Sequence, residues 1–268
     1  MDWWHLIDTS RVFVYMLVLT RVSGLVIMAP ILHTTDAPMQ YRALLAFAFS
    51  LTIMPSQWFV EVPEPDTFPA FAIMIAAELL IGLAMGLGFY ILFAGVALAG
   101  ELMGHVGGLY AAQIFDPVSG DHVPLMSRAY QFLAITVFAL IGGLHVLVCS
   151  LLDTFVTIPI GTIGFQPDVV ISLVIILDMS FNLALRIAAP VLVAALISLF
   201  VMGLLSKTLP QFNLMSVGFG INSMIMFVVF ALTVGTGMWC FQEQIGEVFE
   251  ILFAGLHMSL EDGLLPVR

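Results

Sequence analysis

The sequence predicts an all-α integral membrane protein, with about six long hydrophobic helices or hairpins and a C-terminal amphipathic helix. Of its 268 residues, 61% are hydrophobic and only 9% are charged, whereas about a quarter of the residues in an ordinary soluble domain are charged. Its apolar runs reach or exceed the roughly 20 residues that a helix needs to cross a bilayer. They are also too evenly apolar for the alternating strands of a membrane barrel.

Six apolar segments are expected to cross the bilayer as helices: 12–32, 41–60, 68–102, 130–158, 169–205 and 214–241. Several are separated by Pro-rich turns of the kind that stop helices. These turns are HTTDAP (33–38), EVPEPDTFP (61–69) and PIGTIGFQPD (159–168). The third and fifth segments are longer than the hydrocarbon requires, so they must tilt, kink or project beyond it.

After residue 241 the chain becomes amphipathic. Glu243, Glu247 and Glu250 fall on one helical face, because residues at i, i+4 and i+7 are neighbours on a helix. This spacing predicts that 242–268 forms a further helix, which lies at an interface or against a partner.

The composition excludes several function classes. A formal net charge of −11 argues against nucleic acid, which needs a basic surface, and against electrostatic attachment to anionic lipid. Cys149 and Cys240 lie in apolar runs without metal-ligand spacing, so we expect buried thiols, with no metal and no cofactor. No H-E-x-x-H pair occurs, and nothing in the sequence links His145 to a nucleophile. We therefore expect no catalysis.

Ionisable residues inside the apolar runs are the first candidates for function: Arg21, Glu78, Asp153, Asp178 and Arg186. Because a charge in lipid is expensive, such groups pair with one another or face a polar cavity. We expect Arg21 or Arg186 to pair with Glu78 or Asp153. A role along a transport path is the alternative.

Glycines recur at four-residue spacing, first at Gly82 and Gly86, then at Gly100, Gly104 and Gly108. Small residues at this period allow membrane helices to approach closely. The contacts they permit lie either within the chain or between subunits.

A polar, turn-rich stretch, YAAQIFDPVSGDHVPLMSR (110–128), interrupts the apolar pattern. It is either a plain external connection or a movable stopper. The small residues that lead into it at 103–108, and its apolar Ile114 and Phe115, favour a stopper. Irregular backbone is tolerated at membrane depth where it lines or blocks a cavity.

Several stretches together resemble the FliR and SctT-like export-apparatus family of type III secretion. They include RVSGLVIMAPIL (21–32), AELLIGLAMGLGF (77–89), AGELMGHVGGLYAAQIFDP (99–117), HVLVCSLLDTFVTIPIG (145–161) and LLSKTLPQFN (204–213). The likeness covers nearly the whole chain, in the family's order. One departure is Gly143-Leu144-His145, where the family often has a Gly-His pair.

The resemblance implies a single export-gate domain in the bacterial inner membrane, at the base of a flagellum or injectisome. Its FliP-like part would be 1–168, its FliQ-like hairpin 169–241 and its amphipathic C-terminal segment 242–268. FliP-like and FliQ-like subunits would complete a closed channel for unfolded secreted substrates. An FlhB-like export protein would face the hairpin bend at Lys207, Pro210, Gln211 and Asn213.

The resemblance also places a channel plug at about 106–122. Ile114 and Phe115 would seal the channel, Asp116 and Pro117 would set the turn, and Gly107 and Gly108 would let the plug swing. Two other readings remain. A small-solute transporter would use the intramembrane Asp, Glu or Arg residues, but the inverted repeat typical of that class is not found in the sequence. A purely structural assembly nucleus would tolerate changes in the loop.

Overall fold

The computed structural model describes residues 9–30, 38–58, 60, 62, 65, 67–108, 125–161, 167–208 and 214–255, and every regular element within these ranges is a helix. The all-α membrane fold is therefore confirmed. Within the described ranges, four helices are long and apolar enough to span a bilayer: Ser10–Met28, Phe68–Val106, Val169–Thr208 and Gly220–Gly255. A broken pair, Leu125–Leu140 with Gly143–Thr157, gives a fifth candidate span.

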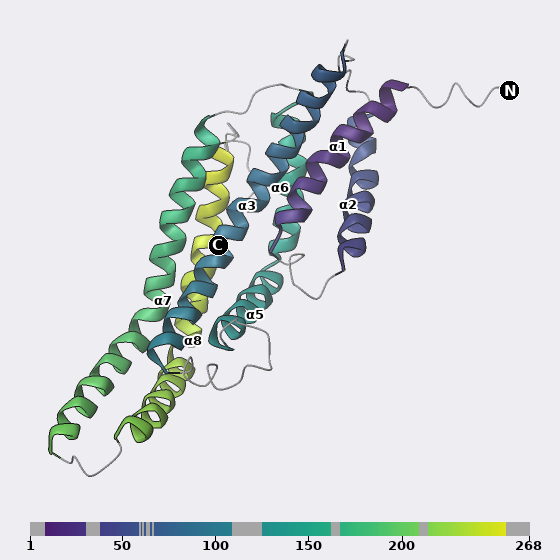
Figure 1. Ribbon diagram of the computed structural model, residues 1–268. Coiled ribbons are helices and arrows are strands. Elements are labelled where there is room, and N and C mark those ends of the chain that lie inside the picture. The colour runs from purple at the N-terminus through teal and green to yellow at the C-terminus, as the bar shows by residue number, and fades with distance from the viewer. Residues whose placement is uncertain are drawn as a thin grey trace. The chain divides into compact units, whose positions relative to one another are not determined.

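Figure 1 shows the helices in chain order. They are α1 (Thr9–Met28), α2 (Met39–Ile53), the 3₁₀ turn η2 (Met54–Gln57), α3 (Phe68–Val106), α5 (Leu125–Leu140), α6 (Gly143–Thr157), α7 (Pro167–Thr208) and α8 (Leu214–Gly255). The helices α3, α7 and α8 have 39, 42 and 42 residues. Each is about twice the roughly 20 residues that the hydrocarbon core requires.

Two of the six expected spans differ from the prediction. The second segment forms an α-helix of only 15 residues. It passes after Ile53 into the 3₁₀ turn that contains Pro55, because proline has no N–H with which to continue the helical hydrogen bonds. The fourth is broken at Ile141 and Gly142, and Gly142 adopts a left-handed φ of 77°, which glycine adopts readily. Hydropathy alone did not reveal either break.

The C-terminal part of α8 is amphipathic, as predicted. Glu243, Glu247 and Glu250 are exposed, whereas Ile245 and Val248 are buried. However, these residues continue α8 through Gly255 instead of starting a separate helix at 242. The remaining residues, 256–268, lie outside the described part of the chain.

The chain divides into two compact units, and the long helices run from one into the other. Unit 1 comprises 1–91, 142–176 and 247–268. Its core includes Phe89, whose ring centroid lies 4.5 Å from that of Phe249. Unit 2 comprises 92–141 and 177–246. Its core is built around Phe93, whose ring centroid lies 5.4 Å from that of Phe138 and 5.2 Å from that of Phe241. Each unit therefore has its own aromatic cluster.

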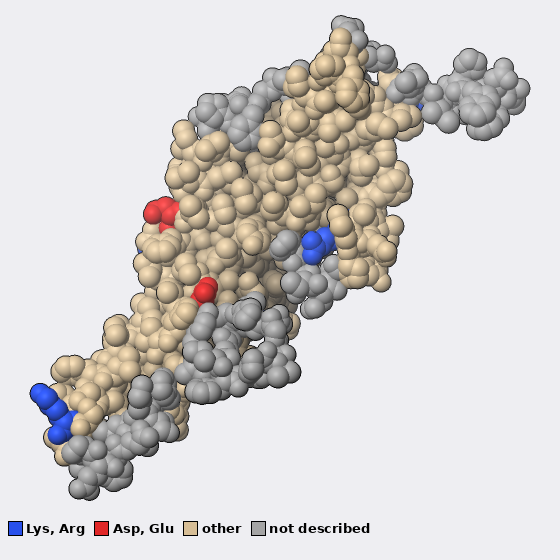
Figure 2. Space-filling model, in the orientation of Figure 1, with Lys and Arg blue, Asp and Glu red and all other residues tan. Residues whose placement is uncertain are grey.

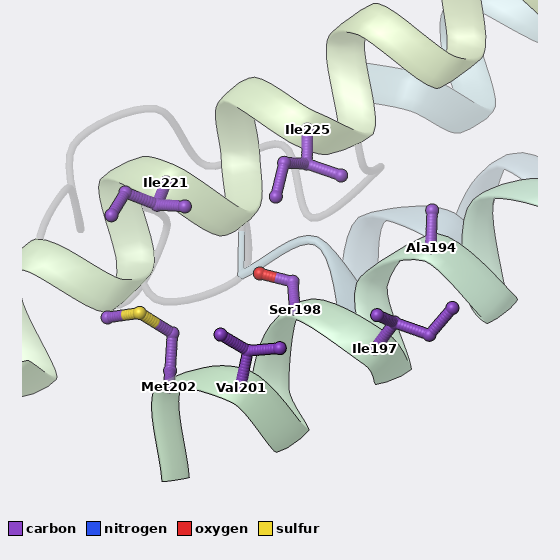
Figure 3. A pocket seen from close by; sticks show the side chains of 7 residues that line it. All are labelled: Ala194, Ile197, Ser198, Val201, Met202, Ile221 and Ile225. Carbon is purple, nitrogen blue, oxygen red and sulfur yellow. The ribbon is translucent and has the colours of Figure 1, made fainter. Parts of the chain in front are cut away.

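Within unit 2, α7 and α8 form an antiparallel hairpin. A groove of about 410 Å³ between them is lined almost wholly by apolar side chains, with Ser198 the one polar group (Figure 3). The buried share of the most apolar stretch is only 28% in α7 and 22% in α8, against 61% in α3. On the face drawn in Figure 2, charged side chains are few and scattered over an uncharged surface. The hairpin therefore presents a broad apolar face to its surroundings.

Candidate functional site

A buried ion pair joins α1 to α3 in unit 1. The Nε of Arg21 donates to the Oε2 of Glu78 at 2.6 Å, and the two side chains are 0% and 1% exposed. Of the pairings that the sequence allowed, this is the one that the structure forms. Neither charge reaches solvent, so each depends on the other for compensation.

The same pair holds the carboxyl end of α6. The Nη1 of Arg21 donates to the carbonyl oxygens of Thr154 at 3.0 Å and Ile158 at 3.1 Å. The Oε1 of Glu78 accepts a hydrogen bond from the backbone N–H of Gly161 at 2.9 Å. The Thr154 carbonyl also accepts the backbone N–H of Ile158 at 2.9 Å, whereas the Ile158 carbonyl lies past the end of α6, where no further helical turn can bond it. Arg21 supplies a donor to both. We call Arg21, Glu78 and these backbone groups of 154–161 the α6 clasp.

Two contacts complete the clasp. The Arg21 guanidinium lies 4.5 Å from the ring centroid of Phe155, a cation–π arrangement that strengthens when solvent is excluded. Gly161 has a left-handed φ of 85°, which lets the chain turn and present its N–H to Glu78. Arg21 and Glu78 were predicted from the sequence as members of a pair, whereas Gly161 was not. The PIGTIG motif (159–164) was the available signal.

Glycines bring α1 and α3 close enough for this pair. A Cβ at Gly24 would lie 2.7 Å from the carbonyl oxygen of Leu79, and one at Gly82 would collide with that of Arg21. A Cβ at Gly86 would lie 2.9 Å from the carbonyl oxygen of Leu25. The contacts of Gly82 and Gly86 are therefore within the chain, which is one of the two alternatives left open by their four-residue spacing.

The other intramembrane charges do not join the clasp. Asp153 is half-buried on α6, while Asp178 and Arg186 are exposed on α7. Asp178 accepts a hydrogen bond from Asn182 of the same helix at 3.3 Å. The Nε2 of His145 lies 3.6 Å from the Sγ of Cys149, which is one turn further along α6. Among the described residues, no three His, Cys, Asp or Glu side chains form a group that could hold a metal ion.

Only the start of the predicted plug lies among the described residues. Gly107 and Gly108 follow the last residue of α3, and Gly108 has a φ of 80°. The other predicted plug residues, Ile114, Phe115, Asp116 and Pro117, lie outside the described ranges. Lys207 is exposed at the end of α7. Its predicted companions in the hairpin bend, Pro210, Gln211 and Asn213, lie outside the described ranges too.

The carboxyl end of α3 carries contacts that sequence reasoning missed. The Nδ2 of Asn222 donates to the carbonyl oxygen of Val106 at 2.6 Å. The Oγ of Ser223 donates to that of Gly107 at 3.0 Å. Both donors lie on α8. The sequence signal for these contacts was an Asn-Ser pair within an apolar run, because a polar side chain is unfavourable in such a run unless it has a partner.

The geometry defines an all-helical membrane protein in which two helix ends, those of α6 and α3, are held by side chains from distant helices. The sequence profile described as bacterial export proteins, family 1, matches residues 12–248. The chain therefore belongs to this family, and the resemblance noted from its motifs is confirmed.

Relatives cover most of the chain. The flagellar biosynthetic protein FliR of Escherichia coli (strain K12) is 31% identical over 246 residues, which are 91% of this chain and 90% of that protein. FliR of Aquifex aeolicus (strain VF5) is 27% identical, over 84% of this chain and 87% of its own length. FliR of Bacillus subtilis (strain 168) is 23% identical, over 80% of this chain and 83% of its own length. These coverages show that the similarity extends through both compact units.

Proposed function

We propose that this chain is a non-enzymatic subunit of a flagellar-type protein export gate in the bacterial inner membrane. The name of its relatives, flagellar biosynthetic protein FliR, favours a flagellar system over an injectisome. FliP-like and FliQ-like subunits would close a channel around unfolded substrates together with this chain. An FlhB-like protein would face the bend between α7 and α8.

One observation carries the proposal that other subunits cover this chain. Asp178 and Arg186 are exposed within the apolar candidate span Val169–Thr208. A charged side chain at the centre of a bilayer costs about 2.5 to 3.5 kcal/mol even on the mildest scale. Charges on this face are therefore better accommodated by a neighbouring protein or a wet channel than by lipid. The broad apolar surface around them suits the large interfaces of permanent complexes.

Reversing the charge of Arg186 is expected to weaken assembly. Arg186→Glu would place a like charge where a partner offers a carboxylate or carbonyl groups, and like-charge contact costs several kcal/mol. Native mass spectrometry of the tagged protein, gently extracted from its own cells, should show one copy in a complex with two other small hydrophobic proteins. In the Arg186→Glu strain that complex should fall at least roughly tenfold.

Arg186→Lys is the control, because it keeps the positive charge and should retain the complex. If the wild-type protein itself purifies as a monomer or homo-oligomer without such partners, the export-gate proposal fails and the small-solute transporter becomes the better reading. If wild type assembles and Arg186→Glu assembles equally well, the exposed charge does not contribute to the interface.

Deleting residues 110–120 is expected to raise ion leakage while the complex still assembles. The proposed plug, with Ile114 and Phe115 as its sealing side chains, lies in this segment. Conductance of the reconstituted complex in planar bilayers measures the effect, with native mass spectrometry as the control for assembly. Unchanged conductance in an assembled deletion variant would contradict the plug and favour a purely structural role.

A further inference from the structure

The helix α2, which packs beside α1 in unit 1 (Figure 1), presents large apolar side chains outwards. Leu44, Phe47 and Leu51 are 64%, 47% and 51% exposed, and their i, i+3, i+7 spacing puts them on one helical face. We call these three residues the outer face of α2. Two of the buried positions, Ala46 and Ser50, hold smaller side chains. Since a large exposed apolar patch is unfavourable in water, the outer face of α2 requires an apolar environment.

The hydroxyl groups of α2 are satisfied within the helix itself. The Oγ1 of Thr52, an exposed residue, donates to the carbonyl oxygen of Ala48 at 3.0 Å, and the Oγ of Ser50 donates to that of Ala46. The sequence has no ionisable residue from 43 to 57. In hydrocarbon every polar group must find its partner within the protein, and α2 meets this condition.

Both ends of this segment carry groups that favour a membrane–water interface. At one end the guanidinium of Arg11 lies 4.5 Å from the ring centroid of Trp58, and at the other Tyr41, an exposed residue, precedes Arg42. Trp and Tyr are enriched at membrane interfaces, and the long side chain of Arg can extend its charge into water. From Tyr41 to Trp58 the chain rises about 28 Å, at about 1.5 Å per residue in α2 and 2.0 Å in η2. The hydrocarbon core of a bilayer is roughly 30 Å thick, so the two ends are spaced to reach both of its surfaces.

The exposed surface of α7 differs in kind from the outer face of α2. It carries the charges of Asp178 and Arg186 within its apolar span, and these are costly in lipid. The outer face of α2 has no charge, no hydroxyl that needs an outside partner, and aromatic residues at both ends. A protein neighbour or water therefore suits α7, whereas lipid suits α2.

We infer that the outer face of α2 lies against the acyl chains of membrane phospholipids in the assembled export gate. Leu44, Phe47 and Leu51 contact the chains, and Tyr41 and Trp58 lie near the two headgroup layers. The inference rests on the proposed function, because it states which face of this chain stays uncovered when the other subunits have bound.

A spin label on Leu51→Cys tests the lipid contact. The variant is made in a chain whose native Cys149 and Cys240 are replaced by alanine, and the assembled complex is reconstituted into nanodiscs of phosphatidylethanolamine and phosphatidylglycerol. Electron paramagnetic resonance measures collisions of the label with oxygen, which dissolves in hydrocarbon, and with a polar nickel chelate, which does not. Oxygen collisions at position 51 should be frequent. Nickel collisions there should be at least roughly tenfold rarer than at Gln40→Cys, an exposed position beside Tyr41, because a polar solute loses its hydrogen bonds to water in hydrocarbon.

Other results overturn the inference. Frequent collisions with both reagents would place Leu51 in water, and rare collisions with both would place it under a protein neighbour. If labelled Leu51→Cys does not assemble, Phe47→Cys repeats the measurement on the same face. Failure of both labelled variants to assemble would indicate that another subunit needs this face, which excludes lipid as its occupant.

Asn182→Cys, at an exposed position of α7 between Asp178 and Arg186, is the matched control. In the complex its label should not combine frequent oxygen collisions with rare nickel collisions, since protein or water is proposed to cover α7. If it does show that lipid pattern while Leu51→Cys shows it too, the proposed cover of α7 fails and the lipid contact of α2 stands. If Leu51→Cys shows the lipid pattern in the isolated chain and loses it on assembly, the lipid contact fails and the proposed assembly stands.

Discussion

Replacing Arg21 by alanine is expected to lower the free energy of unfolding by about 3 to 5 kcal/mol. The substitution leaves the Glu78 carboxylate, which is 1% exposed, buried without its counter-charge. It also removes the side-chain donor to the carbonyls of Thr154 and Ile158, of which the Thr154 carbonyl keeps the backbone N–H of Ile158. Reversible unfolding of the purified protein in mixed detergent micelles, followed by circular dichroism, measures this loss.

A double variant tests the cause. Arg21→Met with Glu78→Leu removes both charges and keeps an apolar volume, and replacing a buried pair in this way is often neutral or stabilising. The double variant should therefore recover most of the stability lost in Arg21→Ala. Lys207→Ala, at an exposed position, should change stability by less than about 0.5 kcal/mol. A loss of under about 1 kcal/mol in Arg21→Ala would contradict the clasp as a stabilising element.

Gly82→Ala is expected to destabilise the protein by about 3 kcal/mol, at the upper end of ordinary overpacking. The added methyl group would meet only backbone: the carbonyl carbon of Arg21 at 2.9 Å and the nitrogen of Leu25 at 3.0 Å. Backbone cannot rotate away as a side chain can, so α1 must separate from α3. The shift would also lengthen the Arg21–Glu78 bond, and the same unfolding measurement should detect both effects together.

Gly235→Ala is the matched control. A Cβ at this exposed position of α8 would meet nothing within 4 Å, and alanine favours a helix over glycine by about 1 kcal/mol. The control should therefore be neutral or slightly stabilising. If both glycine variants behave alike, the close approach of α1 and α3 does not limit stability, and the four-residue glycine spacing is not a packing signal here.

The helical fold could be predicted because the bilayer makes hydropathy nearly sufficient. Long apolar runs without charge must form helices, and α3 and α7 lie within a few residues of their predicted ranges. Breaks within an apolar run were harder to predict. Gly142 and Pro55 alter only the backbone, so mean hydropathy does not register them, and their effect depends on where the neighbouring helices pack.

The charged members of the α6 clasp could be predicted from the sequence, but their pairing could not. The cost of charge in lipid identified Arg21 and Glu78 as members of a pair, but four candidate pairings remained open. The choice depends on which helices are neighbours, which in turn depends on the small residues Gly24 and Gly82. Asn222 was missed because its partner is a backbone carbonyl. Every residue carries a backbone carbonyl, so no residue type in α3 marks the contact.

The α6 clasp also has a consequence for the order in which the chain is made. The carboxylate that compensates Arg21 is 57 residues downstream, and the first carbonyl that its Nη1 binds is 133 residues downstream. At roughly 5 to 20 residues per second, a ribosome reaches Glu78 about 3 to 11 s after Arg21 and Thr154 about 7 to 27 s after it. During that interval the first span carries an uncompensated cation, so α1 must wait in a wet environment, at the insertion machinery or the membrane surface, until its partners arrive.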